Sequence, residues 1–129
     1  MKGWLYEEKV NRKLLNEFGF ERYIPSQWFS FQRFGQKKEF CQTDGLLFTP
    51  KQMKVLIVEV KYKHTPGAYW QLEDKYLPII RWLFRDWEIS TLEIVKWYDP
   101  STQFPTKVIL KKDILSVSPN EFAVHIMTP

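Results

Sequence analysis

The sequence predicts an α/β domain in which helices flank a mixed central β-sheet. Three observations lead to this fold class. An amphipathic helical pattern covers residues 4–18, a hairpin pattern covers 40–62, and a helical pattern at 68–86 separates two apolar strand patterns at 54–62 and 88–98. A chain of 129 residues with one such series of elements has the size of a single domain with one core.

Composition and charge limit the class of protein. The chain has six Trp, six Tyr and ten Phe, so it is not a disordered tail. A net charge of +4 fits a polyanionic partner or an ordinary solvated surface. A single cysteine excludes an internal disulfide, a four-cysteine zinc site and an iron–sulfur cluster. Since we find no signal peptide and no apolar run of about 18 residues, we expect a cytoplasmic protein without a membrane partner.

The first helix carries an acid on its apolar side. Helical spacing places five residues on that side: Trp4, Val10, Leu14, Leu15 and Phe18. Glu7 falls near the centre of the same side and Glu8 toward its edge, while Gly19 is expected to end the helix. An acid within an apolar face is costly unless it has a partner. The alternative is that Glu7 is solvated near the helix N-terminus, where an acid is favourable.

Aromatic residues and Pro25 mark the first strand, which we place at about 27–33. A turn over 35–38 leads into the second strand at 40–48. Three basic residues in this region could contact a phosphate backbone or belong to a solvated loop: Arg33, Lys37 and Lys38.

The hairpin pattern brings charges together at one end of the sheet. With the turn centred between Lys51 and Gln52, three opposed pairs are expected: Phe48 with Val55, Leu46 with Ile57, and Asp44 with Glu59. Lys61 lies two residues beyond Glu59 and therefore shares its face. The sequence thus predicts two carboxylates and one ammonium group at the same point.

Two neighbouring carboxylates repel one another, and burial increases the penalty. A hard divalent cation would offset it, because Mg²⁺ binds through one or two carboxylates together with water and substrate phosphate. The alternative is a solvated strand end with an ordinary Asp/Glu/Lys cluster.

The second half of the chain completes the sheet. Gln71 lies in the first turns of the helix at 68–86, and Pro78 is expected to kink or split that helix. The strands on either side of the helix should be parallel. His64 has no nearby second His, so we expect a loop residue able to contact substrate rather than a zinc ligand. Segments 107–110 and 122–126 are expected to pair as strands near an edge, with a helical turn within 111–118.

Asp44 followed, after a strand, by Glu59-Val60-Lys61 resembles the core of the PD-(D/E)XK nuclease superfamily. Thr43 stands where the nominal motif has Pro. The first-helix acid also fits, and Gln71 resembles the Gln of RecB-like members. Tyr76 follows that Gln by five residues rather than four. The resemblance covers about residues 4–96.

The resemblance implies a restriction-endonuclease-like core over the single domain 1–129. It also implies Mg²⁺-dependent hydrolysis of DNA in recombination or repair, with Mn²⁺ as a substitute. Asp44, Glu59 and the Val60 carbonyl would bind the metal, and Lys61 would hold or activate the attacking water. Gln71 would bind a phosphate or a water. Glu7 would complete the acidic side, although alignment to archaeal Holliday-junction resolvases favours Glu8. A homodimer is expected if both strands are cut.

Two other interpretations remain. One is a nuclease fold without turnover that serves as a nucleic-acid-binding or assembly subunit. The other is an unrelated α/β domain whose charged strand end is incidental.

Overall fold

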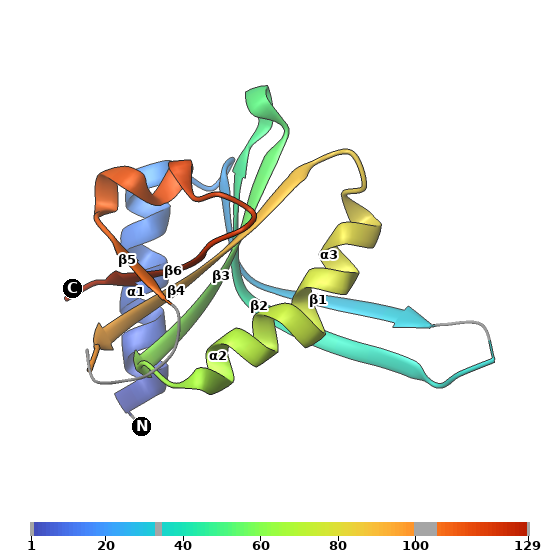
Figure 1. The fold of residues 1–129 in the computed structure, drawn as a ribbon, viewed down its shortest axis with the longest axis horizontal. Coiled ribbons are helices and arrows are strands. Elements are labelled where there is room, and N and C mark those ends of the chain that lie inside the picture. Colours follow the sequence, from blue (N-terminus) through green and yellow to red (C-terminus); the bar gives the residue numbers. More distant parts are fainter. Residues whose placement is uncertain (1, 33–34, 100–105, 129) are drawn as a thin grey trace.

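The structure, a computed structural model, describes residues 2–32, 35–99 and 106–128. It has the predicted α/β class, with a six-stranded mixed sheet in the order β1-β2-β3-β4-β6-β5 (Figure 1). The strands are β1 (Tyr23–Gln32), β2 (Lys38–Thr49), β3 (Lys54–Lys63), β4 (Glu88–Trp97), β5 (Lys107–Ile109) and β6 (Phe122–Ile126). The helical segments are α1 (Lys2–Phe18), η1 (Pro50–Gln52), α2 (Pro66–Trp70), η2 (Gln71–Tyr76), α3 (Leu77–Leu83) and η3 (Lys111–Ser116). None of the described helices is long and apolar enough to cross a membrane.

Helices cover both faces of the sheet. On one face, Val10 of α1 belongs to a buried cluster that includes Val58 of β3. On the other face, Leu72 of η2 belongs to a second cluster that includes Ile57 of β3. Alternate residues of β3 therefore enter two different cores, which is why this strand is apolar on both sides.

The β2–β3 hairpin has the predicted register. Phe48 pairs with Val55 and Leu46 with Ile57 in antiparallel β-structure. The turn is η1, a 3₁₀ segment that ends at Met53 in the left-handed region (φ 51°). The expected pairing of opposed apolar residues is confirmed.

Strand β1 begins earlier than the sequence predicts, at Tyr23 rather than residue 27. Pro25 lies within the strand and pairs with Gly45. This is possible because β1 is an edge strand, where the missing proline N–H faces no neighbouring strand. Ser26, whose φ is 49°, interrupts the β1–β2 pairing between Pro25 and Gln27.

The β1–β2 pair continues beyond the part of β2 that pairs with β3. Pairing of β2 with β3 ends at Gly45. β1 and β2 stay paired beyond this point, from the pair of Gln27 with Thr43 to the pair of Gln32 with Lys38. In Figure 1 this extension projects from the body of the sheet. We call residues 27–32 and 38–43 the arm.

Helix α1 buries the predicted residues except in its first turn. Leu15 and Phe18 pack against the buried cluster, as expected. Tyr6, Val10 and Leu14 are buried, whereas Trp4 is exposed. The three buried residues recur every four positions and therefore lie along one side of the helix, which Trp4 does not share. Tyr6 Oη also donates a hydrogen bond to the Met127 carbonyl (2.7 Å).

The helix between β3 and β4 is split, as Pro78 predicts. A π-helical segment, η2, separates α2 from α3, and Pro78 lies at the start of α3. Proline has no N–H for the carbonyl four residues earlier, so the helix widens just before it. Strands β3 and β4 are parallel, as expected for the two strands that this helix connects.

The last two strands pair with each other, also as expected. β5 forms an edge of the sheet, and β6 lies between β4 and β5 with parallel pairing on both sides. The 3₁₀ segment η3 provides the helical turn expected between them.

Gly45 gives a test of how tightly the hairpin packs. A methyl group on Gly45 would lie 2.0 Å from Tyr23 Oη, whereas one on Gly67 would lie 3.5 Å from Thr65 Oγ1, an ordinary contact. We expect Gly45→Ala to lower the free energy of unfolding by about 2–3 kcal/mol, measured by urea denaturation. Gly67→Ala, near the start of α2, should be neutral or slightly stabilising. Equal effects of the two substitutions would contradict the close approach of Gly45 and Tyr23.

Candidate active site

Asp44 and Glu59 meet where β2 and β3 stop pairing. They lie one position beyond the Gly45–Val58 pair, and Glu59 is two residues from Ile57 on β3, so it shares the face of that residue. Their side chains are within hydrogen-bonding contact of each other. Asp44 Oδ2 accepts a hydrogen bond from the Val60 N–H (2.8 Å), so the β3 main chain fixes this carboxyl group. The two acids converge as the hairpin register predicts.

Helix α1 adds a third carboxyl group. Glu7 is half-buried and makes a side-chain hydrogen bond with Asp44, whereas Glu8 is exposed. The structure therefore brings Glu7, and not Glu8, to the other two acids. Glu7 lies three residues before Val10, so the buried side of α1 directs it toward the sheet end. We call Glu7, Asp44 and Glu59 the acidic cluster.

Lys61 supplies the positive charge at this point. Its Nζ lies 3.4 Å from Glu59 Oε1. Its charge also lowers the pKa of Glu7 and of Asp44, which means that it stabilises their ionised forms. Glu59 and Lys61 are two residues apart on β3, so the strand pleat places both on one face.

Burial makes the acidic cluster reluctant to ionise. Desolvation, followed by the nearby Asp44, raises the pKa of Glu59 to about 8 and that of Glu7 to about 7. Desolvation also raises the pKa of Asp44, against the Val60 N–H and Lys61, which lower it. At neutral pH the cluster therefore retains protons, and a bound cation would displace them.

The donors of the acidic cluster are oxygen atoms, the kind that a magnesium ion prefers. Glu59 Oε2 is buried and has no hydrogen-bond partner among the described residues, which leaves one carboxylate oxygen open for a ligand. Within residues 2–32, 35–99 and 106–128, no group of three or more His, Cys, Asp or Glu side chains could hold a metal ion by itself. Mg²⁺ does not need such a cage, because it keeps several waters and uses one or two carboxylates. The Val60 N–H contacts the acidic cluster through its hydrogen bond to Asp44 Oδ2. Metal binding by the Val60 carbonyl stays a prediction.

Gln71 begins the π-helical segment above this face of the sheet. Its neighbour Leu72 packs in the same cluster as Ile57. Gln71 Oε1 is buried and has no hydrogen-bond partner among the described residues. An unsatisfied amide oxygen in this layer is available for a polar ligand.

A second buried acid lies next to the acidic cluster and was missed by the sequence analysis. Glu93 of β4 pairs in register with Glu59 of β3 and is fully buried. Its Oε1 is hydrogen-bonded to His64 Nδ1, and Glu93 Oε2 and His64 Nε2 have no partner in the described part of the chain. Glu93 lies within an apolar strand just as Glu59 does, and that pattern could have identified it.

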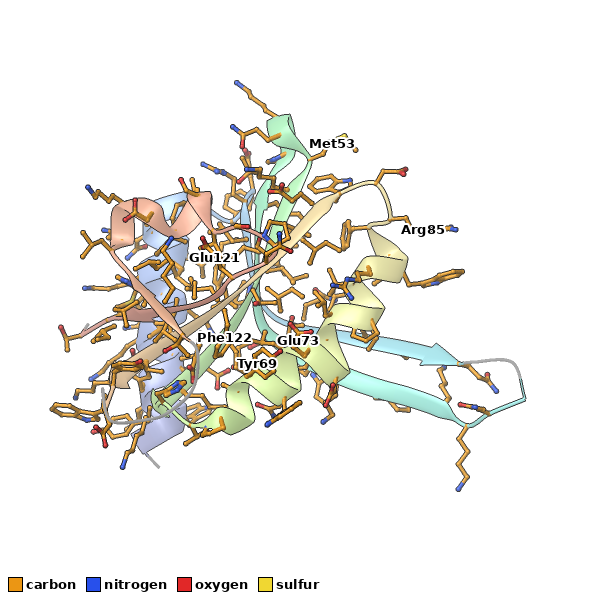
Figure 2. All side chains as sticks on the ribbon, viewed as in Figure 1. Met53, Tyr69, Glu73, Arg85, Glu121 and Phe122 are labelled. Carbon is orange, nitrogen blue, oxygen red and sulfur yellow. The ribbon has the colours of Figure 1, made fainter. Side chains whose placement is uncertain are left out.

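His64 lies in the loop between β3 and α2, as predicted, but its side chain is buried rather than open to a substrate. Pairing of β3 with β4 continues to Lys63–Trp97, and the His64 N–H donates to the Trp97 carbonyl (3.0 Å). The imidazole therefore stays against the sheet, 5.2 Å from the Tyr98 ring and 6.5 Å from the Phe122 ring. Tyr69 of α2 lies edge-to-face on Phe122 and helps to close this region (Figure 2).

The Glu93–His64 pair is neutral near pH 7. Desolvation raises the pKa of Glu93 to about 8, although Lys61 and the Thr65 N–H favour its ionised form. Desolvation lowers the pKa of His64. Both shifts favour a protonated Glu93 that donates to an uncharged His64. The pair thus joins the start of α2 to β4 without adding charge beside the acidic cluster.

No family model, curated protein or solved structure matches this chain. Membership of the PD-(D/E)XK superfamily therefore stays a prediction, and the site is interpreted from its own geometry.

The raised pKa of Glu93 makes stability depend on pH. Between about pH 5 and pH 8 the folded protein binds more protons than the unfolded chain, so the free energy of unfolding should fall as pH rises. Glu93→Gln should remove a few kcal/mol of this fall, since one pKa unit corresponds to about 1.4 kcal/mol. Urea denaturation in chelator at pH 5, 7 and 9 measures the slope.

The matched control for this measurement is Glu121→Gln. Glu121 is partly exposed, and its hydrogen bond with Lys107 lowers its pKa, so the control should keep the wild-type slope above pH 5. A wild-type slope in Glu93→Gln would mean that Glu93 is already ionised in the folded protein.

Proposed function

We propose that the protein is a Mg²⁺-dependent nuclease that hydrolyses phosphodiester bonds in DNA. One observation supports this most strongly. Three carboxyl groups from α1, β2 and β3 meet beside Lys61, and one buried oxygen of Glu59 has no partner in the part of the chain that the structure describes. A purely structural cluster would be expected to satisfy that oxygen internally, whereas a site for a hard cation needs it free.

Each group of the site has a defined task in the proposed reaction. Asp44 and Glu59 would hold the metal together with the Val60 carbonyl, and Glu7 would complete the acidic side. The bound Mg²⁺ would lower the pKa of a water molecule and polarise the phosphoryl group. Lys61, whose Nζ is 3.4 Å from Glu59 Oε1, would hold the attacking water and offset charge that develops on the phosphate. The Gln71 amide would bind a phosphate oxygen or a water.

The substrate class follows from charge and size. A net charge of +4 favours a polyanion such as DNA. The described residues form a single sheet with its covering helices, and a chain of 129 residues leaves little room for a separate sequence-reading module. We therefore infer selection by DNA structure or ends rather than by sequence, as in recombination or repair. Cleavage of both strands would require two sites, supplied by a homodimer.

A second candidate is a silent nuclease fold that binds nucleic acid without cutting it. The observation that favours it is the ion pair between Lys61 and Glu59, since a lysine that neutralises the acid competes with a cation. Such a protein would bind DNA equally well with and without Mg²⁺. Replacement of Asp44 or Glu59 would not weaken its binding.

The cleavage test uses wild-type protein with Mg²⁺ or Mn²⁺ on linear, flap and four-way-junction DNA. Asp44→Asn, Glu59→Gln and Lys61→Met should each reduce the cleavage rate by about a hundredfold or more, because each removes a charge acting on the reacting phosphate. Chelator should abolish cleavage.

Controls for the cleavage test come from the same chain. The control variants are Lys63→Met, at the exposed end of β3, and Asp74→Asn, on the exposed side of η2. Both should cleave at the wild-type rate. If the wild type never exceeds the triple variant of residues 44, 59 and 61 on any DNA, the proposal is wrong.

A further inference from the structure

The arm presents one exposed face that the acidic cluster does not explain. Three cross-strand pairs form this face: Trp28 with Gln42, Ser30 with Phe40, and Gln32 with Lys38. All six residues are exposed. The opposite side of the arm is different, because Phe29 packs against the core cluster under α2 and α3. The arm is thus supported from one side and open on the other.

Two large aromatic side chains dominate the open face. Trp28 is 62% exposed and Phe40 is 63% exposed. They lie on adjacent strands one pair apart, so they are diagonal neighbours. Polar residues separate them, which distinguishes this face from the continuous apolar patch of a protein–protein interface core. Isolated aromatic platforms suit flat ligands that stack on them one at a time.

The charge of the open face is positive. Lys38 Nζ lies 5.7 Å from the centre of the Phe40 ring, and Lys37 is exposed beside it. The six residues of the face include no acid. Arg33, a further basic residue expected near this region, lies outside the described residues. Aromatic faces combined with lysines match a ligand with bases and phosphates.

The open face leads to the acidic cluster. Lys38, Phe40, Gln42 and Asp44 follow one another at every second position of β2, so this strand runs from the open face to the acidic cluster. Asp44 is four positions after Phe40, a distance of roughly 14 Å along the strand. A ligand bound along the arm would therefore reach the carboxylates directly.

We propose that the arm binds an unpaired nucleic-acid strand, with bases stacked on Trp28 and Phe40 and phosphates on Lys37 and Lys38. An unpaired strand is favoured over duplex because only unpaired bases expose their faces for stacking. The identification of this strand as DNA that is delivered to Asp44 rests on the nuclease function proposed above. The binding of an unpaired strand to the arm does not depend on that function.

The experiment measures binding of labelled 20-nucleotide oligothymidine, oligouridine and a 20-base-pair duplex by fluorescence anisotropy in chelator. Wild-type protein should bind at least one single strand more tightly than duplex. Trp28→Ala and Phe40→Ala should each weaken that binding by about tenfold, since the loss of one stacked base typically weakens binding by about 5- to 150-fold. Lys37→Ala and Lys38→Ala should each reduce the slope of log K against log salt by about 0.7.

The matched control is Trp82→Ala. Trp82 is 65% exposed on α3 and has Arg85 4.6 Å from its ring, so it resembles the arm aromatics in exposure and charge. It should bind oligothymidine as the wild type does. Circular dichroism and melting temperature check that each variant is folded.

Three outcomes would overturn the proposal. In the first, the arm variants and Trp82→Ala lose the same amount of affinity for the single strand, and in the second, the wild type binds duplex more tightly than either single strand. In the third, Trp28→Ala/Phe40→Ala changes the oligomeric state without a loss of binding. The nuclease proposal is tested separately. If Asp44→Asn/Glu59→Gln still binds oligothymidine and nothing is ever cleaved, the arm stands and the nuclease falls. If the wild type cleaves DNA, and the arm variants bind and cleave single strands as well as the wild type does, the arm proposal is wrong and the nuclease proposal stands.

Discussion

The rest of the site depends on one constraint: three acids that repel one another are held together at a partly buried point. Desolvation raises the pKa of each acid, so the fold works against their ionisation. Only a few contacts oppose this, chiefly the Val60 N–H on Asp44 and Lys61 beside Glu59. An arrangement that weakens the folded protein at neutral pH is a usual mark of a functional site. A hard cation is the simplest ligand that would stabilise it.

The packing around Gly45 explains how the acids stay together. Gly45 allows the Tyr23 ring to approach the β2 backbone next to Asp44, and Tyr23 Oη donates a hydrogen bond to Asn11 Oδ1 of α1. Asn11 lies one helical turn after Glu7. A single tyrosine thus connects the helix that carries one acid to the hairpin that carries the other two. The arm continues the same strand outward, so it begins next to the acidic cluster.

The sequence predicts the parts of the site that depend on local spacing. The hairpin register follows from directly opposed apolar residues, and it places Asp44 and Glu59 one position beyond the last β2–β3 pair. The position of Glu7 follows from its distance to Val10. The Glu93–His64 pair could not be placed in this way, because the parallel register of β3 and β4 is set by packing across the helix between them. Trp4 and the early start of β1 were misjudged for a similar reason: which side of a helix is covered, and which strand is an edge, depend on tertiary structure.

The central claim is that Asp44 and Glu59 form a cation site. The most direct measurement is the anomalous difference density of crystals soaked in Mn²⁺, collected on the wild type and on Glu59→Gln. The account predicts one strong peak roughly 2 Å from carboxylate oxygens of both Asp44 and Glu59 in the wild type, and its loss in the variant. Saturated wild-type crystals without a peak at these residues, or an equal peak in Glu59→Gln, would contradict it.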